Sequence, residues 1–401
     1  MPQPNRLKLL FVFGTRPEAI KLAPVIRYFR EHFAERIQVD TCVTAQHREM
    51  LDQVLNVFAI HPQYDLNVMR PDQTLASVTG LMLPALEKVL ESSRPDLVFV
   101  QGDTTTTLCG ALASFYARIQ VAHVEAGLRT GDLHQPFPEE LNRVIVSKLA
   151  TIHFAATRQA AANLDSEGIP PERIEVTGNT GIDALLHVKR GLETGELASA
   201  CPLFVPYGSK LILVTAHRRE SFGAGIQHIC TALLAIAESR DVHIVYPVHP
   251  NPRVAEPVRQ LLSGHSRITL TDPLDYVSFV DLLRRACLIL TDSGGIQEEA
   301  PSIGKPVLVL RDKTERPEAI QAGTAILVGT NANDIVVNTE RLLTNASEYQ
   351  RRSQLKNPYG DGTASATIAE YLFNSEWRSF QGLSDPRGSS IGAFAKLQIR
   401  E

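Results

Sequence analysis

Residues 7–30, LKLLFVFGTRPEAIKLAPVIRYFR, decide the fold class because the spacing of their apolar side chains changes once, at a glycine. The run Leu7–Phe13 is short and apolar, which predicts a buried strand, whereas Glu18–Arg30 has the periodicity of a helix. Between them Gly14 permits a sharp turn, and Thr15 begins a sequence that fits a helix capping box. The stretch therefore predicts a strand that leads through a tight turn into a helix.

The same alternation of short apolar runs with longer helical patterns continues along the chain. Apolar runs predict further strands at Gln38–Val43, Leu97–Val100, Val121–Val124, Ile152–Ala155, Leu211–Thr215, His243–Val248, Arg267–Leu270, Leu288–Thr291, Val307–Leu310 and Ala325–Val328. Helical spacing predicts helices that include Met50–Phe58, Leu75–Leu90 and Ile226–Glu238. Alternation of this kind favours parallel sheets with helices on both faces, which is the doubly wound α/β class.

A chain of 401 residues is too long for one ordinary core and suits two domains of about 180 residues each. The stretch from Gly178 to Lys210 contains a polar, glycine-containing segment followed by prolines, as a connection between domains does. We therefore expect one domain at 1–180, a second at 181–363 and a late helix at 364–374. The tail, 375–401, lacks clear periodicity, and we expect it to fray.

Composition argues against several classes of protein. A net charge of −4 without a long basic run is unlike that of a nucleic-acid-binding protein. The first apolar run is too short for a membrane span and lacks a small-residue cleavage site, so we expect a cytoplasmic protein without membrane contact. The cysteines are widely spaced, which predicts buried thiols in a reducing compartment rather than disulfides or zinc ligands; they are Cys42, Cys109, Cys201, Cys230 and Cys287.

The polar residues that follow each predicted strand are the candidates for a site, because doubly wound sheets bind ligands outside the carboxyl ends of their strands. After the first strand, helix capping accounts for Thr15, Pro17 and Glu18. Capping does not account for Arg16 and Lys21, two cations near a helix start, where the macrodipole disfavours positive charge. A bound anion would explain both.

Three carboxylates of the first half are expected on one rim of its sheet. Asp103 follows one predicted strand, Glu125 lies at the end of another, and Glu139 opens a helix together with its neighbour Glu140. Each has a structural explanation: Asp103 suits a helix N-cap, and Glu140 suits a surface acid that complements the helix dipole. Together, Asp103, Glu125 and Glu139 are typical of a site for acid–base chemistry.

The second half has polar residues after its own strands. His217 follows one strand, and Ser293–Gly295 follow another and open a helix, where exposed N–H groups at the positive helix end suit a diphosphate. A glycine turn capped by Asp292 is the structural alternative. Glu299, one turn further on, is placed to accept hydrogen bonds from ribose hydroxyls. Arg316 taken alone is equally compatible with an ordinary surface position.

The motifs of several other chemistries are absent from the sequence. No GxGxxG follows the first strand, and Gly304-Lys305 is followed by Pro306, so it is not a Walker A loop. There is no HExxH, and the histidines show no metal-ligand spacing. These absences argue against hydride transfer, ATP hydrolysis and zinc chemistry.

At these residues the chain resembles the non-hydrolysing UDP-N-acetylglucosamine 2-epimerases. The resemblance extends from residue 7 to around residue 373 and rests on a set of motifs that is far more specific than any one of them. The motifs are GTRPEAIK (14–21), TAQHREMLDQVL (44–55), QGDTTTT (101–107), HVEAGLRTGDL (123–133), PEELNR (138–143), TAHRRE (215–220), TDSGGIQEEAPSIGKPVLVLRDKTERPE (291–318) and NPYGDG (357–362).

The resemblance implies two Rossmann-like domains facing a cleft, as in the GT-B fold, with a late helix that returns to the first domain. It also implies a homodimer and no cofactor. It implies that UDP contacts come from Arg16, Lys21, Phe279, Ser293, Gly294, Gly295, Glu299 and Arg316. It implies catalytic roles for Asp103, Glu125, Glu139 and His217. No metal-binding residue is expected.

Bacterial relatives have a second UDP-GlcNAc molecule that activates the enzyme, and the resemblance assigns this allosteric pocket to Gln46, His47, Arg218 and His249. The chain departs from its relatives at a few positions near these sites. It has Leu274 and Ser221 where Gln and Asn are usual, and Glu49 and Asp72 where some relatives have Gln and Arg.

The implied reaction interconverts UDP-GlcNAc and UDP-ManNAc by inverting carbon 2. That carbon has an unactivated C–H, but departure of UDP from C1 acidifies the C2 proton, and loss of both gives 2-acetamidoglucal and UDP. Re-addition of UDP with protonation from the other face completes the inversion. Arg16 and Arg316 are expected to stabilise the diphosphate charge, and His217 would do the same if it is protonated. The sequence does not assign a carboxylate to each face.

Other functions remain open from the sequence. The nearest is a 2-epimerase of a related UDP-sugar such as a UDP-diacetamido-uronic acid. A GT-B glycosyltransferase would share the fold and the nucleotide site but need an acceptor, and the three carboxylates of the first half argue against it. A hydrolysing epimerase and a non-enzymatic UDP-sugar sensor are the remaining alternatives.

Overall fold

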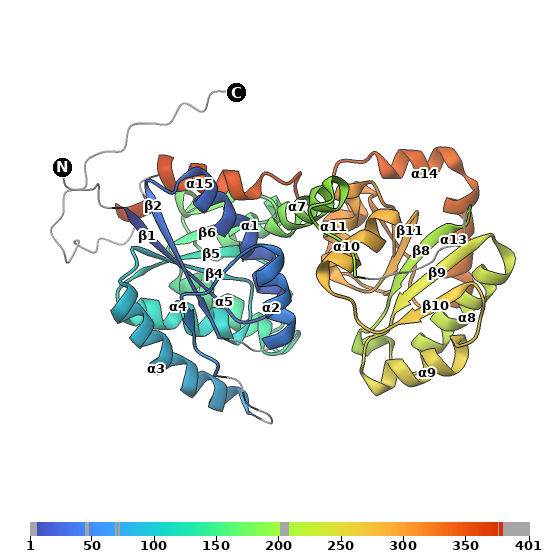
Figure 1. The fold of residues 1–401 in the computed structure, drawn as a ribbon, viewed down its shortest axis with the longest axis horizontal. Coiled ribbons are helices and arrows are strands. Elements are labelled where there is room, and N and C mark those ends of the chain that lie inside the picture. The colour runs from blue at the N-terminus through green and yellow to red at the C-terminus, as the bar shows by residue number, and fades with distance from the viewer. Residues whose placement is uncertain are drawn as a thin grey trace. The chain divides into compact units, whose positions relative to one another are not determined.

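The computed structural model describes residues 6–44, 48–68, 70, 73–200, 208–375 and 377–379. The chain forms two compact units (Figure 1). Unit 1 contains the residues up to Ala184 together with those from Gly360 onward, and unit 2 contains Leu185–Tyr359. Each unit has one fully parallel sheet with helices on both faces, so the predicted doubly wound α/β class is confirmed.

Unit 1 is built on a sheet of seven parallel strands in the order β3-β2-β1-β4-β5-β6-β7. The strands are β1 (Leu7–Phe13), β2 (Ile37–Val43), β3 (Tyr64–Asp65), β4 (Leu97–Gln101), β5 (Gln120–Ala126), β6 (Ile152–Ala155) and β7 (Ile174–Val176). From β1 the next two strands are added on one side, and from β4 onward the strands are added on the other side. The point between β1 and β4 is therefore a topological switch point, which is where this fold binds ligands.

The helices of unit 1 cover both faces of its sheet. They are α1 (Arg16–His32), α2 (Arg48–Val57), α3 (Leu75–Ser93), α4 (Thr105–Tyr116), α5 (Glu139–Leu149), α6 (Arg158–Ser166), the first residues of α7 (Thr180–Thr194) and α15 (Ala364–Asn374), with short 3-10 turns at Pro171–Arg173 and Trp377–Ser379. Helix α15 packs against α1, so the late part of the chain belongs to unit 1.

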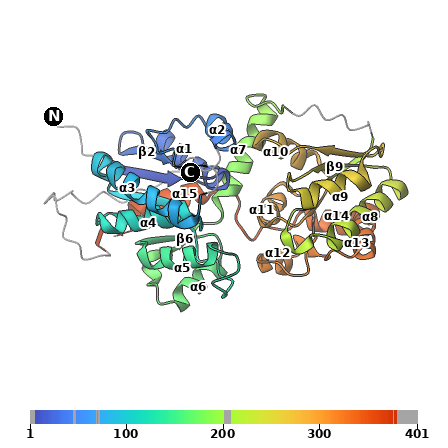
Figure 2. The same cartoon turned by 90° about the horizontal axis from the view of Figure 1, so that it is seen from below.

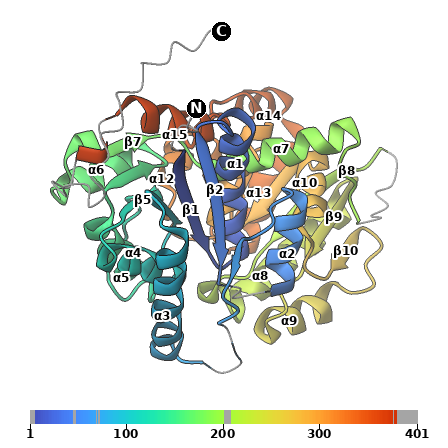
Figure 3. The same cartoon turned by 60° about the vertical axis from the view of Figure 1, so that its left-hand side comes forward.

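Strand β1 shows how sequence alternation divides the core of unit 1 between the two faces. Leu10 and Val12 are buried in a cluster with side chains of α3, α4 and α5. Phe11 points the other way, where its ring stacks on Phe99 at 4.4 Å and lies 6.4 Å from Phe29 of α1. Figure 3 shows α3 and α4 on the opposite side of β1 from α1.

Unit 2 repeats the same winding with six parallel strands in the order β10-β9-β8-β11-β12-β13. The strands are β8 (Lys210–Thr215), β9 (Val242–Pro247), β10 (Ile268–Thr271), β11 (Leu288–Thr291), β12 (Val307–Val309) and β13 (Ala325–Leu327). Its helices are α8 (Ala224–Ser239), α9 (Pro252–Leu262), α10 (Tyr276–Arg285), α11 (Gly294–Glu299), α12 (Pro317–Ala322), α13 (Ala332–Thr344) and α14 (Ala346–Ser353), with 3-10 turns at Arg219–Ser221 and Ala300–Ile303. Here the switch point lies between β8 and β11.

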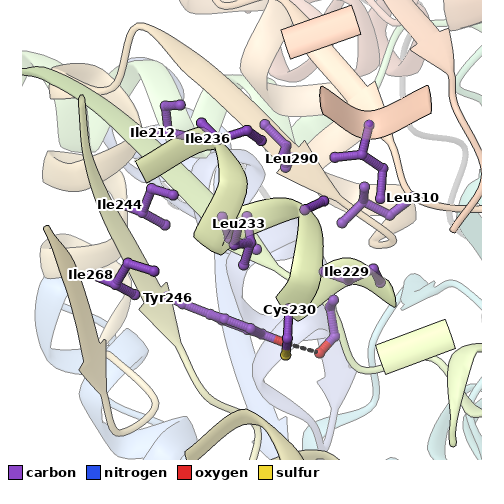
Figure 4. Packing of buried hydrophobic residues seen from close by; sticks show 14 of the residues in the cluster. Ile212, Ile229, Cys230, Leu233, Ile236, Ile244, Tyr246, Ile268, Leu290 and Leu310 are labelled. Atoms are coloured by element: carbon purple, nitrogen blue, oxygen red, sulfur yellow. Dashed lines mark hydrogen bonds between the residues drawn. The ribbon is translucent and has the colours of Figure 1, made fainter. Parts of the chain in front are cut away.

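One face of the second sheet is covered by α8, which packs between α9 and α13 (Figure 2). Figure 4 shows the core beneath it, where Leu233 of α8 belongs to the same buried cluster as Ile212 and Ile244 of the sheet. Full burial of each such side chain contributes about 1.5–3 kcal/mol. Within this core the Tyr246 hydroxyl donates a 2.8 Å hydrogen bond to the carbonyl of Ala216, which fixes the start of the loop after β8.

The strand predictions are confirmed to within one or two residues at each end, but two strands are missing from them. These are β3 and β7, which have two and three residues and lie at the edges of the sheet, and so short a run has no readable periodicity. No described helix is long and apolar enough to cross a membrane.

Two expectations about particular residues need correction. Trp377 lies in the stretch expected to fray, yet it is buried in unit 1 and its indole N–H donates to the Leu372 carbonyl. Of that stretch, 376 and 380–401 lie outside the described residues. Cys42, Cys109 and Cys230 are buried and unpaired, but Cys287 is only partly buried, and Cys201 is not among the described residues.

Candidate active site

The turn after β1 is organised by a buried glutamate. Glu18 is 1% exposed, and its carboxylate accepts hydrogen bonds from the backbone N–H groups of Gly14 and Thr15. The other carboxylate oxygen accepts from the hydroxyls of Thr104 and Thr107, which begin the helix after β4. Burial raises the pKa of Glu18 and these hydrogen bonds oppose the rise. The predicted capping box is present, and Glu18 also ties the two loops of the switch point together.

Gly14 is required at this turn by close packing rather than by its backbone angles. A Cβ at Gly14 would lie 2.0 Å from Oγ1 of Thr44 and 2.6 Å from Oγ1 of Thr106. These two hydroxyls are hydrogen-bonded to each other at 2.9 Å. The end of β1, the end of β2 and the first turn of α4 therefore meet at Gly14, where a side chain would not fit.

Glu125 has a strained backbone at the end of β5. Its φ is +63°, in the left-handed region that a glutamate rarely adopts, and the β5–β6 register shifts at this residue. The carboxylate accepts hydrogen bonds from Lys21 Nζ and Gln101 Nε2, and its side chain is 7% exposed. Backbone strain of this kind clusters at functional sites.

Asp103 follows β4 and lies among other charged groups. Its carboxylate is 2.6 Å from the Arg143 guanidinium, and burial raises its pKa while Arg143 opposes the rise. Glu125 and Glu139 raise this pKa further, so the three predicted carboxylates are near enough to interact. The alternative role of Asp103 as an N-cap is wrong, because Thr104 caps the helix.

The two glutamates that open α5 have different surroundings. Glu139, the first residue of the helix, is partly exposed. Glu140 is 1% exposed, accepts hydrogen bonds from the N–H groups of Thr130 and Gly131 and lies 3.4 Å from Arg143. The interpretation of Glu140 as a surface acid is therefore wrong, because its carboxylate holds the loop that precedes the helix.

In unit 2, Asp292 organises the switch point. Its buried carboxylate accepts hydrogen bonds from the backbone N–H groups of His217 at 2.6 Å and Arg218 at 2.7 Å. Asp292 thus holds the loop after β8, and the alternative in which it caps α11 is wrong, because Ser293 is the N-cap.

The His217 imidazole lies beside Asp292 and stacks on His249 with 5.3 Å between ring centroids. Burial lowers the pKa of His217, an effect that Asp292 opposes and that Arg218 and His249 reinforce. Lowering that pKa favours the neutral imidazole at neutral pH. The lowered pKa argues against the condition that His217 be protonated, although a neutral ring still donates one hydrogen bond.

The glycine turn after β11 lies under an arginine. A Cβ on Gly294 would be 3.5 Å from the guanidinium carbon of Arg316, which also pairs with the buried carboxylate of Glu298. Helix α11 has only six residues and continues directly into a 3-10 turn. The Ser293 N–H donates to the Thr291 hydroxyl at 2.9 Å, so the expectation of three exposed N–H groups is wrong for Ser293.

The remaining predicted residues are placed as follows. Arg16 is at the first position of α1, Phe279 lies on α10 and Glu299 ends α11, and all three are partly exposed. Gln46 and His47 lie outside the described residues. The described residues, whose gaps are given above, contain no group of three or more His, Cys, Asp or Glu side chains arranged to hold a metal ion.

Several partners of these residues were not predicted from the sequence. Gln101, Arg143, Asp292 and Glu298 each contact a predicted site residue. All four lie inside the quoted motifs, so their positions were visible, but their partners are up to 75 residues away in sequence.

Each unit therefore has the fold of a nucleotide-binding Rossmann-like domain with charged residues at its switch point, and unit 1 adds three carboxylates near one another. This is the class of two-domain α/β enzymes related to the GT-B fold.

Comparison with known proteins identifies the family. A sequence model of the UDP-N-acetylglucosamine 2-epimerases matches residues 31–373. A Yersinia pestis protein described as UDP-N-acetylglucosamine 2-epimerase is 54% identical over 375 residues, which are 92% of this chain and 99% of that protein. The chain belongs to the UDP-N-acetylglucosamine 2-epimerase family.

Solved structures agree with this assignment. The Neisseria meningitidis UDP-GlcNAc 2-epimerase bound to UDP-GlcNAc is 48% identical, covers 91% of this chain and 99% of its own, and has a TM-score of 0.84. The Methanocaldococcus jannaschii enzyme in complex with UDP-GlcNAc and UDP is 36% identical, covers 91% of this chain and 99% of its own, and has a TM-score of 0.74.

Proposed function

We propose that this chain interconverts UDP-GlcNAc and UDP-ManNAc by inverting carbon 2 of the sugar without net hydrolysis. Membership of the family supports UDP-GlcNAc as the substrate, and one feature of unit 1 supports proton transfer at carbon 2. That feature is the charge interaction of Asp103 with Glu125 and Glu139, because inversion at a C–H carbon needs a base for one face and an acid for the other.

The mechanism that we propose begins with cleavage of the C1–O bond to UDP. Positive charge that develops at C1 acidifies the C2 proton, which a carboxylate removes, and the products are 2-acetamidoglucal and UDP. UDP then adds back to C1 while C2 receives a proton on the opposite face. The reaction gains and loses one proton at C2, so it needs no oxidant and no hydride carrier.

Asp103 and Glu125 each lie beside a cation of unit 1. Burial raises the pKa of Asp103 and its pair with Arg143 opposes the rise. The ion pair with Lys21 stabilises the ionised carboxylate of Glu125, as a base requires. We propose that these two residues and Glu139 perform the proton transfers, and that His217 donates a hydrogen bond from its neutral ring.

We propose that UDP is bound by the residues that the family resemblance assigns to it. The placement of the Arg316 guanidinium over Gly294 supports this proposal, because a cation beside backbone N–H groups is an arrangement that binds a diphosphate. The proposed UDP-binding residues are Arg16, Lys21, Phe279, Ser293, Gly294, Gly295, Glu299 and Arg316.

The test of the reaction is NMR of UDP-GlcNAc with the enzyme in deuterated water, without added nicotinamide or metal. Solvent deuterium at C2 of both UDP-GlcNAc and UDP-ManNAc is the expected result. Inversion that keeps the original hydrogen would overturn the elimination mechanism. Release of free ManNAc would indicate a hydrolysing enzyme, and turnover only with a related UDP-sugar or an acceptor would indicate one of the other classes.

We also propose that a second UDP-GlcNAc molecule activates the enzyme through Gln46, His47, Arg218 and His249. In unit 2, the stacking of His249 on His217 supports this, because His217 belongs to the proposed site, and the Arg218 N–H donates to the same Asp292 carboxylate as the His217 N–H. Sigmoidal rates in UDP-GlcNAc are expected, and Arg218→Ala or His249→Ala should make them hyperbolic. Hyperbolic rates in the unchanged protein would refute the proposal.

We propose finally that the chain acts in the cytoplasm as a homodimer. The unpaired state of the described cysteines supports a reducing compartment, and the family resemblance supports the dimer. Light scattering of the purified protein tests the assembly, and a mass of one chain would refute it.

A further inference from the structure

A buried histidine lies beside the turn that presents Asp103. His123 is a residue of β5, the strand next to β4, and its side chain is fully buried. Its Nε2 lies 2.7 Å from the carbonyl oxygen of Gly102, the residue before Asp103. The same glycine has a φ of +72° and its N–H donates to the carbonyl of Val124, so both its polar backbone groups bond to β5.

The carbonyl oxygen of Gly102 determines which nitrogen of the His123 ring carries a hydrogen. A carbonyl oxygen accepts hydrogen bonds and cannot donate one, so Nε2 must carry the hydrogen. Burial lowers the pKa of His123 to about 4, the Gly102 hydrogen bond and Glu125 oppose this effect, and Arg129 and Arg143 reinforce it. The ring is therefore neutral at neutral pH, with Nε2 protonated and Nδ1 unprotonated.

The turn at Asp103 is held by three side chains. His123 donates to the Gly102 carbonyl, Asn142 donates to the Asp103 carbonyl at 2.9 Å, and Arg143 pairs with the Asp103 carboxylate. Asn142 and Arg143 both come from α5, whereas His123 comes from the sheet. Of these three side chains, His123 is the one that ties the turn to the sheet of unit 1.

Loss of the imidazole donor would leave the Gly102 carbonyl without this hydrogen bond inside the protein, and a buried acceptor without a donor favours a change in the turn. The peptide that contains this carbonyl joins Gly102 to Asp103, so its rotation would move the carboxylate. A displacement of about 1 Å from the productive geometry is enough to reduce a rate a hundredfold.

We propose that His123 is a positioning residue that holds the Gly102 carbonyl through its Nε2–H and thereby fixes the direction of the Asp103 carboxylate. This inference rests on the proposed function only in assigning a catalytic role to Asp103. An apolar side chain of similar size would fill the same space in the core but could not orient the turn.

The kinetic test compares His123→Leu with His123→Gln and with His153→Leu. Glutamine keeps an N–H donor at about the distance of Nε2, whereas leucine keeps only the volume. His153 is the register partner of His123 on β6, is equally buried, and is separated from β4 by β5, so it is the matched control. The measurements are kcat and KM for UDP-GlcNAc on the full chain, with unfolding followed by Trp377 fluorescence.

We expect His123→Leu to lower kcat by about ten- to a hundredfold with little change in KM. His123→Gln should recover most of this loss, and His153→Leu should leave kcat within about threefold of the original. Equal losses in His123→Leu and His153→Leu, or no recovery in His123→Gln, would show that burial alone matters and would overturn the proposal.

A second measurement needs no substrate and reads the ring of the unchanged protein directly. Two-bond ¹H–¹⁵N NMR spectra of protein labelled with ¹⁵N-histidine distinguish the two neutral tautomers from the charged ring, with His123→Gln used to assign the signal. The charged and titratable groups that act on His123 are Arg129, Arg143, Glu125 and His153. We expect the neutral Nε2–H form across the neutral pH range, and an Nδ1–H or charged ring would overturn the proposal. If the unchanged protein shows this tautomer but no epimerisation, the proposed function fails and the hydrogen bond stands.

Discussion

Replacing Lys21 by methionine removes the cation from a pair that is almost entirely buried. The side chains of Lys21 and Glu125 are 17% and 7% exposed, so little water reaches the carboxylate that remains. Removing one partner of a buried pair costs about 3–5 kcal/mol, because the other charge is left uncompensated. Gln101 still donates to Glu125, so we expect a loss near the lower end, about 3 kcal/mol in the free energy of unfolding.

The assay is urea unfolding followed by tryptophan fluorescence. Trp377 is the only tryptophan in the chain and is buried in unit 1, so its signal reports the unit that contains the pair. The matched control is Arg27→Met on the same helix, because Arg27 pairs with Glu31 in an exposed pair. Exposed pairs of this spacing contribute about 0.3–0.5 kcal/mol.

The double variant Lys21→Met/Glu125→Gln should recover most of the lost stability, since no buried charge remains. The loss in Lys21→Met alone should also shrink as the pH is lowered and Glu125 is protonated. If Lys21→Met costs no more than Arg27→Met, or if the double variant is no more stable than Lys21→Met, the buried ion pair does not stabilise unit 1 and the reasoning is refuted.

Gly14→Ala should cost about 1–3 kcal/mol through its clash with the Thr44 hydroxyl, and Gly14→Ala/Thr44→Ala should be more stable than Gly14→Ala by urea unfolding. Because the pKa of Glu18 is raised in the folded protein, its contribution to stability is fully present below the pKa of the unfolded chain and is lost as the pH rises through the folded pKa. Glu18→Gln should therefore gain stability relative to the unchanged protein as the pH increases. Parallel curves of unfolding free energy against pH for the two proteins would contradict this. Asp103→Asn should lower kcat about a hundredfold with UDP binding unchanged by calorimetry, and near-normal turnover would exclude an acid–base role. Arg316→Ala should weaken UDP binding about tenfold or more, and an unchanged affinity would place the diphosphate elsewhere.

Local sequence patterns were sufficient for most of the fold. The change from a run of apolar residues to helical spacing around Gly14 predicted β1 and α1, and that pattern with its repetitions predicted eleven of the thirteen strands in the described residues. Capping chemistry is equally local, so the box of Thr15 and Glu18 was predictable. Patterns of this kind act between neighbours in the chain, where spacing alone fixes which side chains meet.

The candidate site was predicted as a set of residues, but not as a set of contacts. Asp103 and Asp292 were both interpreted as possible caps, because an aspartate after a strand and before a helix often has that role. The structure instead pairs Asp103 with Arg143 and uses Asp292 to hold the loop that contains His217. Such pairings join residues that the winding of the sheet brings together, and sequence spacing does not report them.

The sequence by itself determined the fold class, the order of strands and helices, and the family, because each depends on local periodicity or on motifs that are continuous in the chain. Only the tertiary structure decided the directions of the pKa shifts and the partners of the charged groups. Burial raises the pKa of Glu18 and Asp103 and lowers that of His123 and His217, and Lys21 forms an ion pair with Glu125. The physical reason is that the free energy of a charge depends on its access to water and on charges from distant parts of the chain, and both are set only when the sheets assemble.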